Sequence, residues 1–314
     1  MSQSRTSLDD NEYTTRFNRL NGAINNLSFN IRKHWVTLPP WIDRFVSPEA
    51  LKTGKQEMTA VGRAVVSKWV VEEIFNHCFH PCLDPDLSQQ LKEIERNIRK
   101  FSYKMHSQEE YDALTSKVVS WRMTTLEGLQ AALGSPDSHQ HRADFTQRAA
   151  TNLTASLFQH LTDPPPDGVD GSASMIVELA VGLAFHLPME SRDVAITYPM
   201  PLDPVNPHLM DVEKAGLPAL EDAGDEDDEE EGGKDDKGGK GAKSRGGTSS
   251  KLGAGQANLP VRKGSLASPS ATGNTDQPSA IAPPGDSGKI RFAGFLAVDV
   301  RGRQVLVKAP VWTV

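Results

Sequence analysis

The stretch YTTRFNRLNGAINNLSFNI, residues 13–31, decides the fold of this chain. Its apolar side chains recur at alternating spacings of four and three residues, at Tyr13, Phe17, Leu20, Ile24, Leu27 and Ile31. This period of about 3.5 residues predicts an amphipathic helix with one narrow apolar seam, as in coiled coils and helix bundles. Asp9 or Asp10 can cap the N-terminus of that helix.

Helical periodicity continues to about residue 190, and helix boundary signals divide it into segments. Ser47-Pro48 begins a helix that we expect to run to about Phe79, and Pro81 ends it. Asp84-Pro85 and the capping box from Ser107 to Glu110 begin two more. Two further helices are expected on either side of the proline run at 164–166. The fold class is therefore mainly α, an irregular bundle of six or seven helices.

The spacing of apolar residues changes from helical to alternating near the C-terminal end of this region, and strand-like runs occur again at the end of the chain. Residues 194–198 alternate apolar and polar side chains, which is typical of a strand. Residues 290–300 and 304–308, with a turn at Arg301-Gly302 between them, predict a β-hairpin within 289–314. An isolated hairpin is only marginally stable in water, so we expect this one to fold back onto the helical domain 1–223 and to pair with residues 194–198.

Residues 224–288 form a long insertion of different composition. The segment has no Phe, Trp, Tyr, Met or Cys, and it opens with seven consecutive acids at 225–231. A Gly/Lys tract and a Ser/Pro/Ala tract follow. Such a segment cannot bury enough apolar surface to offset the entropy of ordering, so we predict that it is disordered.

Composition restricts the class of protein. The 314 residues carry a formal net charge of −7. No apolar run reaches the ~20 residues of a membrane-spanning helix, and the N-terminal residues lack the apolar core of a secretory signal. The chain has two cysteines, which excludes a disulfide framework and indicates a reducing compartment. We expect an intracellular protein, cytoplasmic or nuclear, that makes no membrane contact.

One cluster suggests metal chemistry. His77, Cys78, His80 and Cys82 place four potential zinc ligands within six residues. Structural zinc sites usually take their ligands from two separated pairs, and no second cysteine pair exists here. The alternative interpretation is the end of a helix with buried cysteines. We therefore predict no cofactor, and keep a metal-binding protein or metalloenzyme as an alternative that depends on this cluster.

The insertion carries two further motifs. Five basic residues at 234–245 are the basis of a nucleic-acid-binding alternative. The whole insertion is net acidic and has no aromatic side chain to stack on bases, so nucleic acid is not the expected partner. Arg262-Lys263-Gly264-Ser265 resembles a kinase site that follows basic residues, which makes Ser265 a candidate phosphorylation site.

Two blocks carry a resemblance to a known family. RFNRLNGAINNLSFNIRK at 16–33 and TGKQEMTAVGR at 53–63 are similar to an uncharacterised helical region of filamentous-fungal proteins. The resemblance covers about residues 12–135. It implies an all-helical domain and no established activity.

The function that this pattern favours is a non-catalytic helical module for protein interaction or scaffolding. No nucleophile motif favours an enzyme. The apolar seam predicts a contact surface for a protein partner or for a second copy of the chain. The residues expected on this surface are Phe17, Leu20, Ile24, Leu27, Ile31, Trp35 and Trp41.

Overall fold

The structure, a computed structural model, describes residues 8–54, 56–100, 107–220, 288–301 and 303–314. These residues belong to one compact unit made from both ends of the chain. Within these residues six helices have 15 residues or more: α1 (Asp10–Ile31), α4 (Gln56–Val70), α5 (Pro85–Arg99), α6 (Gln108–Gly128), α8 (Asp137–Phe158) and α9 (Val169–His186). Three shorter ones lie between them, α2 (Pro40–Asp43), α3 (Pro48–Thr53) and α7 (Gln130–Leu133). The mainly α fold class is confirmed.

Three of the predicted helix starts have the expected side-chain caps. The carboxylate of Asp9 accepts the backbone N–H of Glu12 at 2.7 Å, and Asp84 caps α5 in the same way. The hydroxyl of Ser107 accepts the N–H of Glu110 at 3.2 Å. Each cap satisfies an N–H group that has no partner within its helix.

The segment 47–79 differs from the single helix expected there. Gly54 has a φ of 54°, a left-handed conformation that ends α3, and α4 begins two residues later. A π-helical turn, Val71–Phe75, then follows α4 directly. Ser47 does not cap α3, because its hydroxyl donates to the carboxylate of Glu57 instead.

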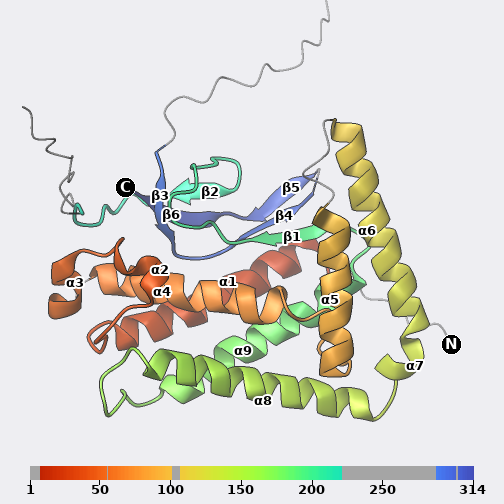
Figure 1. Cartoon of the computed structure of the whole chain (residues 1–314), viewed down its shortest axis with the longest axis horizontal. Helices are drawn as coiled ribbons and strands as arrows, with labels where there is room; N and C mark the ends of the chain where they lie inside the picture. Colours follow the sequence, from red (N-terminus) through yellow and green to blue (C-terminus); the bar gives the residue numbers. More distant parts are fainter. Residues whose placement is uncertain (1–7, 55, 101–106, 221–287, 302) are drawn as a thin grey trace, which may run out of the picture. The chain divides into compact units, whose positions relative to one another are not determined.

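The helices form layers below two small sheets (Figure 1). Helix α1 packs against α4 on one side and α9 on another, and α8 lies on the far side of α9. At the contact of α1 with α4, a Cβ added to Gly62 would lie 2.9 Å from the Cβ of Ser28. Only a glycine allows the two helix backbones to approach this closely.

In the part of the chain that the structure describes, six strands form the β part: β1 (Val194–Thr197), β2 (Met210–Val212), β3 (Ile290–Ala293), β4 (Ala297–Val300), β5 (Gln304–Val307) and β6 (Ala309–Thr313). One sheet has the order β1-β4-β5 and is antiparallel throughout. In it Val194 pairs with Val300, so the expected pairing of the C-terminal segment with residues 194–198 is confirmed. The expected hairpin is β4–β5.

A second sheet, of order β2-β6-β3, was not expected. The apolar run 290–300 is two strands and not one, because the chain leaves the sheet β2-β6-β3 after Ala293 and enters the sheet β1-β4-β5 at Ala297. Phe295 and Leu296, between the two strands, are completely buried. Burial of this connection explains why the sequence shows an unbroken apolar run.

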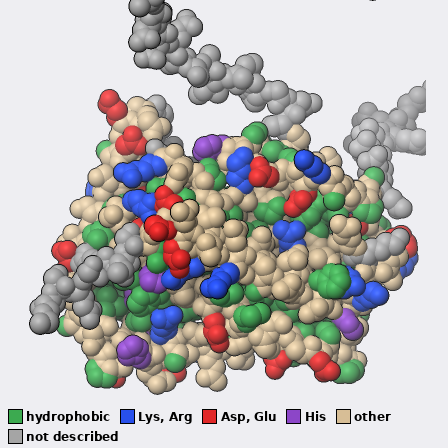
Figure 2. Space-filling view, turned by 180° about the vertical axis from the view of Figure 1, so that it is seen from behind, with side chains coloured by type: hydrophobic (Ala, Val, Ile, Leu, Met, Phe, Trp, Pro, Cys, Tyr) green, Lys and Arg blue, Asp and Glu red, His purple; other side chains and the backbone are tan. Residues whose placement is uncertain are grey.

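Helix α9 explains one further feature of the composition. With its 3-10 extension it covers Val169–Met189, a segment long and apolar enough to cross a membrane by length and composition alone. Ile176, Val177 and Ala180 are buried in the core, and the helix packs on α1 and α8. Core packing accounts for part of this composition, since 44% of the apolar window is buried. On the face shown in Figure 2, acidic and basic side chains are interspersed, with small apolar areas between them.

Candidate functional site

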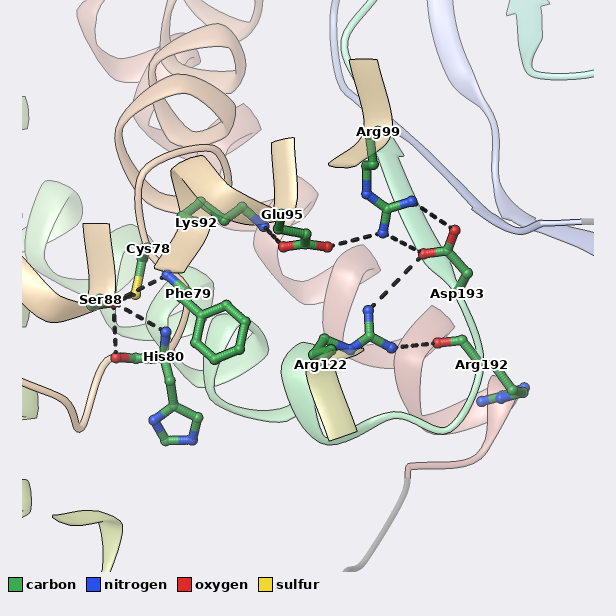
Figure 3. A network of polar contacts seen from close by, with 10 residues as sticks. All are labelled: Cys78, Phe79, His80, Ser88, Lys92, Glu95, Arg99, Arg122, Arg192 and Asp193. Carbon is green, nitrogen blue, oxygen red and sulfur yellow. Dashed lines mark hydrogen bonds and ion pairs between the residues drawn. The ribbon is translucent and has the colours of Figure 1, made fainter. Parts of the chain in front are cut away.

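A network of buried charges joins helices α5 and α6 to the segment before β1 (Figure 3). Its centre is Asp193, whose side chain has no exposed surface. Arg99, at the end of α5, donates through both Nη atoms to the two oxygens of Asp193, at 2.9 and 2.7 Å. Arg301, directly after β4, lies 3.3 Å from the same carboxylate. Such two-pronged arginine contacts fix the orientation of both groups.

Glu95 and Arg122 extend this network. Glu95 lies between Lys92 and Arg99, at 3.1 and 2.9 Å. Burial alone would raise the pKa of Glu95, but these two cations outweigh it and lower the pKa to about 2. Arg122, from α6, donates to the carbonyl oxygens of Glu190 and Arg192 at 2.7 and 2.8 Å. The loop 190–193 is therefore held through its backbone as well as through its side chains.

A second buried ion pair connects the C-terminal strands to the N-terminal helices. The guanidinium of Arg291, on β3, donates to the carboxylate of Glu57, on α4. Glu57 also accepts the backbone N–H of Ser47 at 2.9 Å. Arg291 donates further to the carbonyl oxygens of Phe45 and Pro218, each at 2.6 Å. This pair gives β3 a fixed place on α4.

A cavity of about 230 Å³ lies beside the first network. Its walls come from α5, α6, the π-helical turn and β1. The cationic side chains that line it are Lys92, Arg96, Arg99, Arg122 and Arg301. Glu95 is the one carboxylate among the lining residues of the described chain. Positive charge is therefore in excess around this cavity.

A larger and more open groove of about 1060 Å³ follows the contact of α8 with α9. Small side chains such as Ala143, Ala150 and Ser174 line it, together with the larger Leu179. Phe158 and Met175 stand in the groove with 40% and 46% of their surface exposed. Exposed large apolar side chains within one concave surface are typical of a binding site.

The structure does not bring the expected metal ligands together. His77 is exposed, while Cys78, His80 and Cys82 are buried. In the described part of the chain, no three His, Cys, Asp or Glu side chains form a group that could hold a metal ion. The metal-binding prediction therefore finds no support in the geometry.

The turn after α4 uses these residues structurally instead. The hydroxyl of Ser88, on α5, accepts the N–H groups of Phe79 and His80, both at 3.1 Å. The Cys78 sulfur points toward Ser88, whereas the His80 ring points away from it (Figure 3). Burial raises the pKa of the Cys78 thiol to about 11, and this makes it a poor nucleophile at neutral pH. Burial and the nearby Arg142 and His186 lower the pKa of His80 to about 4.

The seam of α1 is not a contact surface in the folded chain, which corrects that prediction. The side chains of Phe17, Leu20, Ile24, Leu27 and Ile31 are completely or almost completely buried among α4 and α9. Trp35 is also buried and stacks on His160. Trp41 is half-buried, with the Lys68 ammonium 5.2 Å from its ring. The periodicity was produced by the chain's own core.

Three predictions concern residues that the structure does not describe. The disordered segment 224–288 lies outside the described residues except for Gly288. The basic tract 234–245 and Ser265 lie within that part of the chain.

Sequence reasoning missed the two buried networks, although the sequence holds a signal for each. Arg122 occupies a position of the apolar stripe of α6, four residues after Val118 and four before Leu126. Glu57 directly precedes the buried stripe of α4 that begins at Met58. A charged residue at a position where the helical period requires an apolar one predicts a buried, paired charge.

Comparisons with known proteins give no relative from which function could be transferred. No family model, no curated protein and no solved structure matches this chain.

Proposed function

We propose that this chain is a non-catalytic protein-interaction module whose contact surface is the groove between α8 and α9. The observation that supports this most is the exposure of Phe158 and Met175 within one groove of about 1060 Å³. Helix α8 packs on α9, and the side of α8 that faces away from α9 is not covered by the rest of the described chain. The similarity to a filamentous-fungal helical family stays a prediction, as does an intracellular location.

The occupant that fits this groove is an amphipathic helix of a partner protein. Helices α8 and α9 have 22 and 18 residues, so the groove accepts several turns of a third helix. Small side chains along its walls let a helix backbone approach closely, and Phe158 and Met175 supply apolar anchors. This is the helix-in-groove mode, in which apolar residues at i, i+3, i+4 and i+7 are recognised.

Charges at the two ends of the groove favour one orientation of that helix. The Arg142 guanidinium lies 5.0 Å from the ring centre of Phe185, so the start of α8 lies beside the end of α9. His139 and Arg142 therefore line one end, and Asp170, in the first turn of α9, lines the other. The positive N-terminus of a helix is attracted to carboxylates. We expect the partner helix to direct its N-terminus toward Asp170.

The chemistry of the buried groups supports a module without catalysis. His80 has a pKa of about 4 and Cys78 one of about 11, so neither is poised for proton transfer or nucleophilic attack at neutral pH. Glu95 and Asp193 are held in ion pairs with arginine. Groups held in this way stabilise the fold.

Site-specific photo-crosslinking tests the proposal. A photoreactive residue placed at Met175 in the full chain should form an adduct with a partner protein in cells. The same residue at Ile94, which is equally exposed on α5 but lies outside the groove, should not. A Phe158→Asp substitution should remove the adduct, and the adduct peptide should have a helical apolar pattern.

Orientation gives a second readout. A photoreactive residue at Ala143, near the cationic end of the groove, should react with the partner helix on the C-terminal side of the position that reacts with residue 175. Equal labelling from positions 94 and 175 would reject the groove as the contact surface. An adduct between two copies of this chain would show that the groove binds a second copy and not a helix of another protein.

A further inference from the structure

The cavity beside Asp193 carries more positive charge than its own carboxylates balance. Lys92, Arg96, Arg99, Arg122 and Arg301 line it. Against these five cations stand Glu95, in the cavity wall, and Asp193, which Arg99 and Arg301 contact. The carboxylates of Glu190 and Asp299 act on Arg122 and Arg301 from outside the cavity wall, so the excess belongs to the lining itself, where five cations face one carboxylate. Buried or confined charge of one sign is costly unless an opposite charge joins it.

Two of the cations have unused hydrogen-bonding capacity. The Nε atom of Arg122 is buried and has no hydrogen-bond partner among the described residues. The whole Arg122 side chain is only 5% exposed, and its Nη2 donates to backbone carbonyl oxygens. Arg96, which is exposed, makes no ion pair or side-chain hydrogen bond with the described chain. Burial lowers the pKa of Arg122, and the carboxylates of Glu95 and Asp193 act in the opposite direction.

We propose that this cavity binds a phosphate group. A phosphate monoester carries about 1.5–2 negative charges at neutral pH, so it would supply negative charge where the lining has one carboxylate. Its oxygens accept hydrogen bonds from several guanidinium groups at once, and arginine suits this geometry better than lysine does. The volume of about 230 Å³ leaves room for the phosphate and for a short group attached to it. This site is separate from the groove of α8 and α9, so either proposal can fail alone.

The probe for this proposal is inorganic phosphate, followed through the Arg122 side chain. The Nε–Hε resonance of Arg122 in ¹⁵N-labelled full chain should shift and saturate as sodium phosphate is added at pH 7.5. Sodium chloride at matched ionic strength should produce no saturable shift. An Arg96→Ala variant should bind phosphate about tenfold more weakly, because one charge-assisted hydrogen bond is lost. Arg19→Ala removes an equally exposed arginine from α1, away from the cavity, and should leave the affinity unchanged.

The source of the phosphate group is resolved by a second titration. A synthetic peptide of residues 259–270 is compared with and without a phosphate on Ser265. Tighter binding of the phosphorylated peptide than of inorganic phosphate identifies a phosphorylated side chain as the ligand. Tighter binding of inorganic phosphate identifies a small phosphate-bearing molecule.

Three outcomes would overturn the proposal. The first is the absence of a saturable Arg122 shift with both inorganic phosphate and the phosphopeptide. The second is an equal response to chloride. The third is an unchanged phosphate affinity in the Arg96→Ala variant, because that side chain lines the proposed site and has no other partner in the described chain.

Discussion

Replacing Glu57 by Gln should remove a large part of the stability of this fold. Glu57 and Arg291 are 3% and 2% exposed, and they join α4 to β3 across 234 positions of the chain. Glutamine has nearly the same shape as glutamate, so packing is retained while one charge of the pair disappears. The Arg291 guanidinium then stays buried with neutral acceptors alone, the carbonyl oxygens of Phe45 and Pro218 and the amide oxygen of the introduced glutamine.

The size of the effect follows from the burial of the pair. Removing one partner of a buried ion pair typically costs about 3–5 kcal/mol, because the other charge is left uncompensated. A domain is typically stable by about 5–15 kcal/mol, so Glu57→Gln should remove roughly a fifth or more of the total. The double variant Glu57→Met with Arg291→Met removes both charges. The free energy of unfolding of this double variant should be much closer to that of the natural chain than the value for Glu57→Gln is, since apolar residues often replace buried pairs at little cost.

Urea unfolding followed by far-ultraviolet circular dichroism measures both effects. The matched control is Glu12→Gln on α1, which breaks an exposed pair with Arg16 and should cost less than about 1 kcal/mol. If Glu57→Gln costs no more than Glu12→Gln, the pair is not buried as described and β3 does not lie on α4. If the double variant is as unstable as Glu57→Gln, the loss arises from packing and not from the uncompensated charge.

Two other predictions concern packing and pH. Gly62→Ala should destabilise the fold by about 1–3 kcal/mol, because the added Cβ would overlap Ser28. Gly171→Ala, on α9 with open space around it, is the control and should stabilise the fold by up to about 1 kcal/mol. Equal effects of the two substitutions in thermal unfolding would show that α1 and α4 are not in close contact. Stability should fall as the pH drops from 6.5 to about 4, because the unfolded chain takes up a proton on His80 in this range and the folded chain does not. The loss of unfolding free energy due to His80 should reach about 3 kcal/mol. A His80→Gln variant that kept the full pH dependence in urea titrations would show that His80 is not the group responsible.

The sequence predicted those parts of the fold that depend on local patterns. The apolar period of α1, the caps at Asp9, Asp84 and Ser107, and the alternation at 194–198 each reflect a preference of a few adjacent residues, and all are present. The pairing of β1 with β4 was predicted by a physical requirement, since the C-terminal strands could not be stable alone. The break at Gly54 was missed, because a glycine within a helical pattern does not by itself determine its φ.

The candidate sites depend on contacts that local patterns do not specify. A period shows that a helix has an apolar stripe, but it does not show whether this stripe faces the chain's own core or a partner. The seam of α1 was assigned to a partner because the apolar content of α9, which covers it, could not be placed in space. Asp193 lies 94 positions from Arg99 and 108 from Arg301, so no local spacing relates them.

Charges within apolar stripes connect these observations to function. Glu57 and Arg122 both stand in or beside buried stripes. Glu57 forms a close ion pair with Arg291, whereas Arg122 lies 4.0 Å from the carboxylate of Asp193 and its Nε has no hydrogen-bond partner among the described residues. A pair that only held the fold together would be complete, as Glu57 and Arg291 are. The Asp193 network leaves the Nε of Arg122 without a partner among the described residues, and the cavity beside it is lined by five cations and one carboxylate. For this reason the cavity is better explained as a place for an anion than as a second structural clamp.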